Sequence, residues 1–175
     1  EGRAELIRGQ ARVVRPGSVE VEGRELEYAH LVVATGSEPA VPPIDGIDEV
    51  EYWTNREAVW ADGPPESLVV LGAGPVGCEL AQYFHRLGAT VTVVASSRLL
   101  DKVDREAAEL LRERFEDEGI ELRFGAKAER IEKTGSGVRV HTSTGDPIEA
   151  ERLLVATGRK PNVDGFGLEQ LDVEI

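Results

Sequence analysis

One stretch of the sequence has residue types and a spacing that suit a specific chemistry, the binding of a dinucleotide. Between Ser67 and Ala95 a short apolar run meets three glycines, a helical segment follows, and a second β-branched run ends the unit. In such a unit Gly72 permits a tight turn, Gly74 lets a pyrophosphate approach the backbone, and Gly77 lets the helix pack closely on the strand. G-x-G-x-x-G alone is a weak signal, but the flanking strand and helix make it specific.

The helix after the turn explains why this stretch needs no lysine to hold an anion. Pro75 suits the first position of a helix. A helix that begins there directs free N–H groups and the positive end of its dipole at the loop, where two phosphates can bind. Glycines that only packed a helix on a sheet would explain Gly77 but not the other two. The residues expected at the phosphates are Gly72, Ala73, Gly74, Pro75, Val76 and Gly77.

Composition argues against several other functions. The 175 residues carry a formal net charge of -13 without an extended basic cluster, which disfavours nucleic acid and anionic membranes as partners. No apolar run approaches the roughly twenty residues that span a bilayer, so we expect a cytoplasmic protein. The single cysteine, Cys78, has no disulfide partner in the chain and is interpreted as a core residue. We expect no metal site.

The patterns around the glycine turn predict an α/β fold with a Rossmann-like βαβαβ parallel sheet. A second helix is expected over 104–118, with Asp104 as its N-cap and Gly119 as its left-handed stop. A third parallel strand is expected over 121–124. Strands of two antiparallel meanders are expected at 11–14, 19–22 and 24–28, and at 128–132, 137–142 and 147–150.

An internal repeat relates the two meanders. LEYAHLVVATGSEPAVP at 26–42 is similar to IEAERLLVATGRKPNVD at 148–164. Each copy is expected to contain a buried strand, at 31–34 and 153–156. Only the second copy follows a complete βαβαβ unit, so the pattern indicates that the chain begins inside one nucleotide-binding domain and holds a second nearly whole.

The segment between the first repeat and the glycine turn differs in composition. Residues 37–65 are rich in proline and acidic side chains and are predicted to form an irregular connector. Trp53 and Trp60 are expected to anchor this connector against a neighbouring surface.

These motifs together resemble the pyridine nucleotide-disulphide oxidoreductases, the flavoprotein family of dihydrolipoamide dehydrogenase, glutathione reductase and mercuric reductase. The resemblance is carried by ATGSEPAVPPIDG, GAGPVGCELAQ and ATGRKPN, in this order and spacing. It implies hydride transfer between NAD(P)H and FAD in a parent enzyme that is a homodimer through a domain absent here. It also implies that 1–65 is the later part of an FAD-binding domain with a connector, 66–158 an NAD(P)-binding domain, and 159–175 a return segment.

The resemblance assigns roles to residues beyond the glycine turn. Glu79 matches a glutamate near the nicotinamide and is the one catalytic candidate. Gly158 matches a glycine beside the nicotinamide ribose, and Ala128 a residue near the adenine. The positions that match flavin contacts are Ala11, Thr35, Gly36 and Ser37.

Other hallmarks of the family are not found in these residues, among them the FAD glycine loop and the redox-active cysteine pair. We therefore expect the chain to bind a nicotinamide dinucleotide without turning it over. The alternative is a stand-alone dinucleotide-binding module, such as a redox sensor or an accessory subunit that borrows flavin and thiols from another chain.

The residues after the second parallel strand bear on the choice between NADH and NADPH. An NADH-selective site has an acidic residue at the end of this strand that binds the ribose hydroxyls, and here that position is Ala95. Ser96, Ser97 and Arg98 follow with two hydroxyls and a guanidinium. The sequence therefore favours NADPH. The alternative is a site that accepts both cofactors, with Arg98 directed to solvent.

Overall fold

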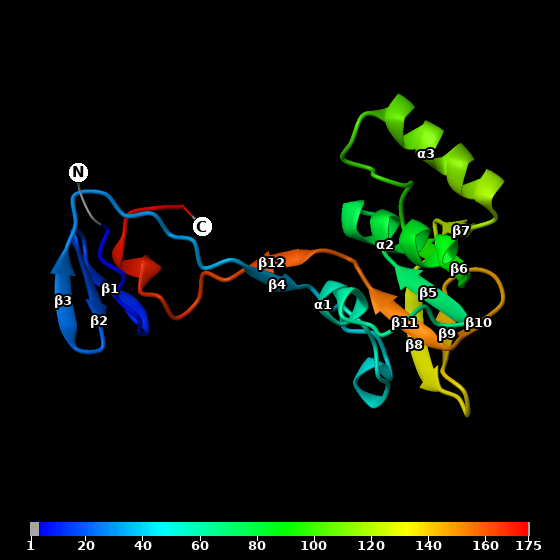
Figure 1. The fold of residues 1–175 in the computed structure, drawn as a ribbon, viewed down its shortest axis with the longest axis horizontal. Coiled ribbons are helices and arrows are strands. Elements are labelled where there is room, and N and C mark those ends of the chain that lie inside the picture. The colour runs from blue at the N-terminus through cyan, green and yellow to red at the C-terminus, as the bar shows by residue number, and fades with distance from the viewer. Residues whose placement is uncertain (1–3, 175) are drawn as a thin grey trace. The chain divides into compact units, whose positions relative to one another are not determined.

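The computed structural model describes residues 4–174, and the chain divides into two compact units. The larger unit is Pro39–Arg159, and the smaller unit combines the described residues of Glu1–Glu38 and Lys160–Ile175. Figure 1 draws the elements of both units. The glycine turn lies in the larger unit, which therefore decides the geometry of the candidate site.

A four-stranded parallel sheet forms the centre of the larger unit. Its order is β11 (Arg152–Val155), β5 (Ser67–Leu71), β6 (Thr90–Ala95) and β7 (Glu121–Phe124), and every neighbouring pair is parallel. Sheets of this kind are covered on both faces, which explains why their strands are nearly continuous apolar runs. The prediction of an α/β fold with a parallel sheet is confirmed.

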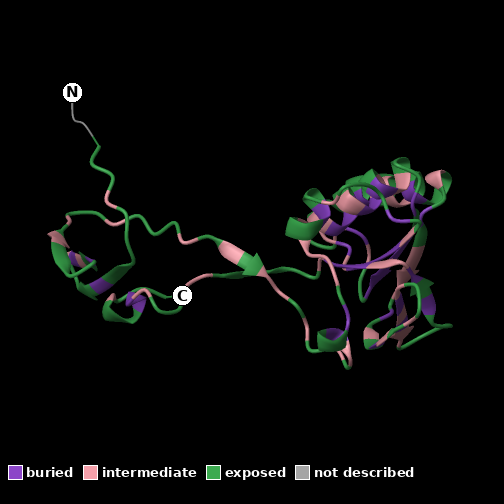
Figure 2. Cartoon of the chain, turned by 60° about the horizontal axis from the view of Figure 1, so that its bottom comes forward, coloured by how far each residue is buried: buried purple, intermediate pink, exposed green. Residues whose placement is uncertain are grey.

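Two apolar clusters cover the two faces of this sheet. Because side chains alternate along a strand, Leu68 and Val70 of β5 face the helices, whereas Val69 and Leu71 face the opposite side. The helix side is covered by α2 (Pro75–Arg86) through Cys78, Ala81 and Phe84, and by α3 (Arg105–Glu118) through Phe115. Figure 2 shows the buried residues between these layers.

Helix α3 begins and ends at the two capping residues that the sequence predicts. The side chain of Asp104 accepts hydrogen bonds from the backbone N–H groups of Glu106 and Ala107, and Gly119 ends the helix at φ 92°. Asp104 therefore satisfies two of the donors that a helix N-terminus leaves free. Both predicted end signals of the helix are confirmed.

Antiparallel meanders occur in both units, as predicted. In the larger unit β8 (Ala128–Lys133), β9 (Val138–Thr142) and β10 (Ile148–Ala150) cover the second face of the parallel sheet. In the smaller unit β1 (Ala11–Arg15), β2 (Ser18–Val21) and β3 (Arg24–Glu27) form the corresponding sheet. A 3₁₀ helix, η2 (Leu168–Gln170), follows Phe166, whose carbonyl accepts a hydrogen bond from the N–H of Val13 at 2.8 Å.

The predicted buried strand at 31–34 is wrong. The segment has no regular structure, and Val32 is 87% exposed. Its counterpart in the second repeat is β11, which pairs with β5 on one side and with the backbone of Trp53 on the other. Within residues 4–174 the first copy has no equivalent of β5 to pair with, and a similar sequence therefore does not form a strand.

The connector is more regular than predicted. It contains β4 (Ser37–Pro39), which pairs with β12 (Arg159–Pro161), the 3₁₀ helix η1 (Ile47–Glu49) and α1 (Asn55–Val59). Trp53 does anchor it, because its ring centroid lies 5.5 Å from that of Phe84. Trp60 does not, since it is 85% exposed at the end of α1.

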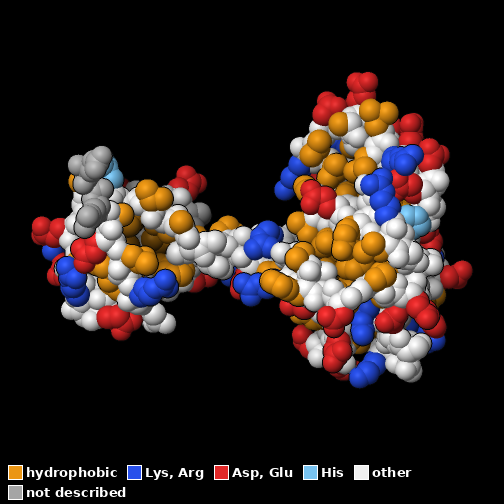
Figure 3. Space-filling model, in the orientation of Figure 1, with side chains coloured by type: hydrophobic (Ala, Val, Ile, Leu, Met, Phe, Trp, Pro, Cys, Tyr) orange, Lys and Arg blue, Asp and Glu red, His pale blue; other side chains and the backbone are white. Residues whose placement is uncertain are grey.

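The surface of the larger unit carries many charges, and Figure 3 shows acidic side chains beside basic and hydrophobic ones in the region of α3. One of them, Glu118, joins the C-terminal ends of α2 and α3. It accepts hydrogen bonds from Arg86 and Arg114, both at 2.7 Å, and from Gln82 at 3.1 Å. The hydrogen bond from Arg86 is the largest cause of a pKa of Glu118 lowered to about 2. No helix within residues 4–174 is long and apolar enough to cross a membrane.

Replacing Glu118 should change how stability depends on pH. A carboxyl whose pKa is lowered on folding stabilises the protein above its ordinary pKa of 4.5, and this contribution is lost as the pH falls toward about 2. The difference in unfolding free energy between wild type and Glu118→Gln should therefore shrink steadily from about pH 5 to about pH 2. Urea unfolding across this range measures it, with the exposed Glu113→Gln on the same helix as control. A difference that stays constant with pH would contradict this role.

Candidate functional site

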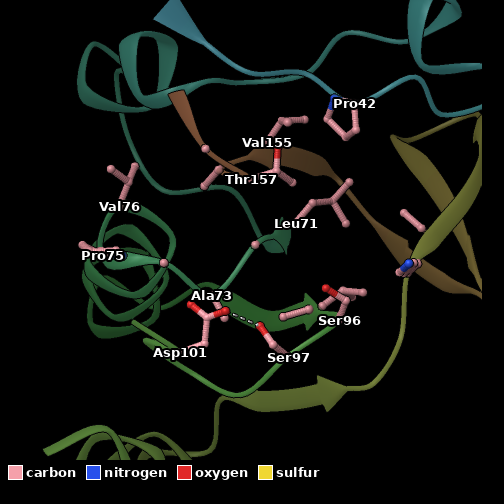
Figure 4. A pocket seen from close by; sticks show the side chains of 18 of the residues that line it. Pro42, Leu71, Ala73, Pro75, Val76, Ser96, Ser97, Asp101, Val155 and Thr157 are labelled. Carbon is pink, nitrogen blue, oxygen red and sulfur yellow. Dashed lines mark hydrogen bonds between the residues drawn. The ribbon is translucent and has the colours of Figure 1, made fainter. Parts of the chain in front are cut away.

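A large cavity lies in the larger unit, at the carboxyl ends of β5, β6 and β11. Its volume is about 870 Å³, within the range of small-molecule and cofactor sites. In open parallel sheets this edge is where ligands bind. The walls are the glycine turn after β5, the loops after β6 and β7, Thr157–Arg159 after β11, and part of the connector. Figure 4 shows these walls from close by.

Two glycines of the turn are required by the packing of the backbone. Gly72 has φ 107°, and a Cβ there would overlap the carbonyl oxygen of Ala156. At Gly77 a Cβ would overlap the carbonyl oxygen of Gly72. The backbones of β5, α2 and the end of β11 are therefore in direct contact at this point. This geometry agrees with the structural roles predicted for these two glycines.

Gly74 differs from both. Its φ of -76° and ψ of 179° are accessible to any residue. A Cβ at this position would have no atom within 4 Å, and the residue lines the cavity. Neither backbone strain nor internal packing explains this glycine. Its missing side chain leaves space free in the cavity itself.

Helix α2 presents its N-terminus to the same space. It begins at Pro75, has Gly74 as an N-cap without a side-chain acceptor, and carries no acidic residue in its first turn. The first N–H groups of a helix have no carbonyl partner within it. Together with the helix dipole they form a site for an anion. Pro75 and Val76 lie on the wall beside Ala73 in Figure 4.

Cys78 lies beneath this turn and is a core residue, as predicted. It is 4% exposed, and its thiol lies 3.4 Å from the carbonyl oxygen of Ala73. Burial, with a smaller contribution from Glu79, raises the pKa of the thiol to about 11. The thiol is therefore protonated at neutral pH and is a poor nucleophile.

The loop after β6 forms the next wall. Ala95, Ser96 and Ser97 line the cavity, as does Asp101. The hydroxyl of Ser97 donates a hydrogen bond to the Asp101 carboxylate at 3.2 Å, drawn as a dashed line in Figure 4. Arg98 also lines the cavity, but its guanidinium donates to backbone carbonyls of its own loop. The acceptors are the oxygens of Leu99, Leu100, Asp101 and Val103, at 3.0 to 3.2 Å.

The sequence analysis missed several polar and charged residues of the cavity wall, among them two lysines. Lys102 lies on the loop after β6 and Lys127 follows β7. The signal was available, because parallel strands bring the residues after their carboxyl ends to one edge of the sheet. The described wall thus carries four cations, Arg98, Lys102, Lys127 and Arg159, against the single carboxylate of Asp101. The cavity is cationic in a chain whose formal net charge is -13.

The wall after β11 contains the second ATG motif, Ala156–Gly158. Gly158 lines it, and the hydroxyl of Thr157 donates to the carbonyl oxygen of Ala40 at 2.6 Å. The guanidinium of Arg159 donates to the side chain of Asn55 at 3.1 Å. Ala128, the first residue of β8, also lines the cavity. Residues from four distant parts of the sequence therefore meet at one site.

Other predicted residues lie elsewhere. Glu79 is exposed on α2 and is not part of the cavity wall. The positions matched to flavin contacts, Ala11 and Thr35–Ser37, belong to the smaller unit. There the hydroxyl of Thr35 donates to the carbonyl of Asn162 at 2.5 Å, and the carbonyl of Gly36 accepts from the Asn162 N–H. No group of three metal-ligating side chains occurs among the residues that the structure describes.

Comparison with known proteins identifies relatives of the whole chain. Residues 1–175 match the family model described as pyridine nucleotide-disulphide oxidoreductase. The mercuric reductase of Lysinibacillus sphaericus is 38% identical over 174 residues, which cover 97% of this chain and 32% of that protein. The dihydrolipoyl dehydrogenase of Thermus scotoductus is 38% identical over 181 residues, covering 99% of this chain and 39% of that protein.

A solved structure is similar over nearly the same region. The HOCl-induced flavoprotein disulfide reductase RclA from Escherichia coli, in a Cu(II) complex, superposes with a TM-score of 0.82 at 28% identity. The match covers 95% of this chain and 38% of that one. The chain therefore spans 32% to 39% of the length of these relatives.

The glycines of the turn should differ in their effect on stability. Gly72→Ala should lower the unfolding free energy by at least about 1 kcal/mol, because it adds strain at positive φ and a clash with Ala156. Gly74→Ala should lower it less, because the new methyl group meets no atom and the φ is ordinary, so that only the N-cap preference for glycine over alanine is lost. Urea unfolding of both variants at pH 7 measures the difference. Equal losses, or a larger loss for Gly74→Ala, would refute this reading of the turn.

Proposed function

The chain belongs to the pyridine nucleotide-disulphide oxidoreductase family, and we propose that the cavity of its larger unit binds NADH or NADPH. The observation that carries this proposal is Gly74. No backbone strain or packing contact requires a glycine there, yet a side chain would occupy the cavity beside the first turn of α2. A bound pyrophosphate needs this space, since it must approach the backbone N–H groups closely.

The charge of the cavity supports the same proposal. A dinucleotide carries two phosphates, and the wall provides the N-terminus of α2 together with Lys102, Lys127 and Arg159. We propose a bound dinucleotide whose pyrophosphate contacts Gly72–Gly77. The adenosine lies toward Ala95–Arg98 and Ala128, and the nicotinamide ribose lies toward Gly158. The dinucleotide then spans the carboxyl ends of all the central strands.

In the complete enzyme we assign this chain to the step between nicotinamide and flavin. The relatives are named as reductases and dehydrogenases, and the solved neighbour is a flavoprotein. Glu79 is the catalytic candidate of this step. Glu79 follows Pro75 by four residues and Val76 by three, so it lies on the same face of α2 as these two residues, one turn further along the helix. Pro75 and Val76 line the cavity.

The flavin itself is not held by the described residues alone. The hydroxyl and carbonyl oxygens of Thr35 and the carbonyl oxygen of Gly36 are already paired with Asn162. We propose that FAD, the redox-active thiols and the dimer contacts belong to other parts of the complete enzyme. In this scheme 1–65 contributes to the FAD-binding domain and connector, 66–158 is the NAD(P)-binding domain, and 159–175 returns toward the FAD-binding domain.

The larger unit favours NADPH over NADH in this proposal. Ala95 ends β6 without a carboxylate that would repel a 2′-phosphate. Because the guanidinium of Arg98 is bound to backbone carbonyls, the charges for this phosphate are those of Lys102 and Lys127, which are both exposed on the wall. Asp101 opposes them, but its carboxylate accepts a hydrogen bond from Ser97.

Gly74→Val should abolish binding of the cofactor without unfolding the chain. The valine side chain would occupy the place of the pyrophosphate, so affinity for NADPH should fall by more than about tenfold. Titration followed by nicotinamide fluorescence measures this. The control is Gly63→Val, at an exposed glycine that also has no atom within 4 Å and lies outside the cavity. Normal binding by Gly74→Val would show that the site is misassigned.

Lys102→Ala and Lys127→Ala should separate the two cofactors. A hydrogen bond to a charged group contributes about 1.5 to 3 kcal/mol, so each variant should lose about tenfold or more in affinity for NADPH and little for NADH. Lys133→Ala, outside the cavity, is the control. Wild type that binds NADH as tightly as NADPH, or variants that lose both cofactors equally, would refute the preference.

A further inference from the structure

The loop of residues 97–103 has an unusual internal contact that the proposed function does not explain. The two terminal nitrogens of one guanidinium, Arg98, donate to four carbonyl oxygens of this loop. Nη1 reaches the oxygens of Leu99 and Leu100, both at 3.2 Å. Nη2 reaches those of Asp101 at 3.1 Å and Val103 at 3.0 Å. Four carbonyl dipoles of the loop therefore converge on one cation.

The backbone of the loop needs such a partner. Leu100 has φ 48°, a left-handed conformation that side chains other than glycine rarely adopt. Carbonyl oxygens that point to a common centre repel one another unless a donor neutralises them. Arginine suits this centre, because its guanidinium is permanently charged and presents donors in a rigid plane.

Two further contacts fix the loop to the body of the unit, and a third joins two residues within the loop. Leu99 is 1% exposed and belongs to the core on the helix side of the sheet. The N–H of Leu100 donates to the carbonyl of Ala73, in the glycine turn, at 2.8 Å. The hydroxyl of Ser97 donates to Asp101 across the loop. The position of the loop is thus coupled to the turn that faces the pyrophosphate.

We propose that Arg98 is a positioning residue: it holds the 97–103 loop as a wall of the cavity and makes no contact with the cofactor. The proposal rests on the proposed dinucleotide binding. It assigns to Arg98 a task different from that of Lys102, which the same loop carries into the wall. A guanidinium that turned to a 2′-phosphate would leave its four carbonyl acceptors without this partner.

The two roles predict different binding data. Both cofactors share the adenosine that lies against the wall, so a disordered wall weakens NADH and NADPH by the same factor. Loss of a phosphate ligand weakens NADPH alone. We expect Arg98→Ala to lower affinity for both cofactors by on the order of tenfold, with the ratio of the two dissociation constants unchanged within about twofold. Arg105→Ala, an exposed arginine at the start of α3 outside the cavity, should bind both as wild type does.

Arg98→Lys provides a second variant that keeps the charge. One ammonium has a single nitrogen and cannot reproduce the planar donor pair, so a positioning role predicts a smaller loss shared by both cofactors. A phosphate-ligand role predicts retained NADPH affinity. Selective loss of NADPH in Arg98→Ala, or unchanged binding of both cofactors, overturns the proposal.

Hydrogen exchange of the free protein tests the same role without any nucleotide. The amides of Leu100 and Val103 donate to Ala73 and Leu100 and should exchange faster in Arg98→Ala than in wild type, while the β5 amides keep their protection. Unchanged exchange in the loop overturns the proposal. If wild type binds neither cofactor, the proposed function fails, and the exchange result alone then decides whether Arg98 orders the loop.

Discussion

The close main-chain packing between β5, α2 and the end of β11 is the constraint on which the rest of the site depends. At Gly72 and Gly77 a single extra carbon would overlap backbone oxygens. Because these elements meet so closely, the first turn of α2 lies beside the carboxyl end of the sheet and its free N–H groups open into the cavity. Any added atom at these two glycines would move the helix and thus the centre that attracts an anion.

The other walls are fixed to this junction through few contacts. The N–H of Gly72 donates to Val94 at 2.9 Å, and the N–H of Leu100 donates to the neighbouring Ala73. On the other side, the N–H of Ala156 donates to Leu71 at 2.8 Å. The loops after β6 and β11 are therefore positioned by Leu71, Gly72 and Ala73, where β5 ends and the turn begins. The cavity has a volume of about 870 Å³, and none of the charged side chains described on its wall is buried.

The sequence predicted those parts of the fold that depend on local patterns. The β5–α2–β6 unit, both end signals of α3 and the two meanders follow from apolar periodicity, caps and turn residues. The segment 31–34 was predicted wrongly, because LVVATG forms a strand only where a neighbour such as β5 is available to pair. Trp60 was also placed wrongly, since its exposure depends on how the short helix α1 ends.

The site, like the fold, was predictable where it depends on local sequence patterns and not where it depends on tertiary contacts. The glycine turn and Ala95–Ser97 could be placed at one sheet edge from topology, and Lys102 and Lys127 could have been added by the same argument. Gly158 was assigned through the family resemblance. The partners of Arg98 could not be foreseen, because they are carbonyls of an irregular loop that includes a left-handed Leu100. Sequence patterns predict which side chains lie near a site, but not which backbone carbonyl oxygens will accept hydrogen bonds from them.

Mapping backbone amide shifts of the isotopically labelled chain during titration with NADPH would test the central claim most directly. If the pyrophosphate binds at the glycine turn, the largest and saturable shifts belong to the amides of Gly72, Ala73, Gly74, Val76 and Gly77, with smaller shifts at Ser96–Lys102 and Thr157–Arg159. Shifts confined to the smaller unit, or saturable binding that leaves the amides of Gly74, Val76 and Gly77 unmoved, would contradict it.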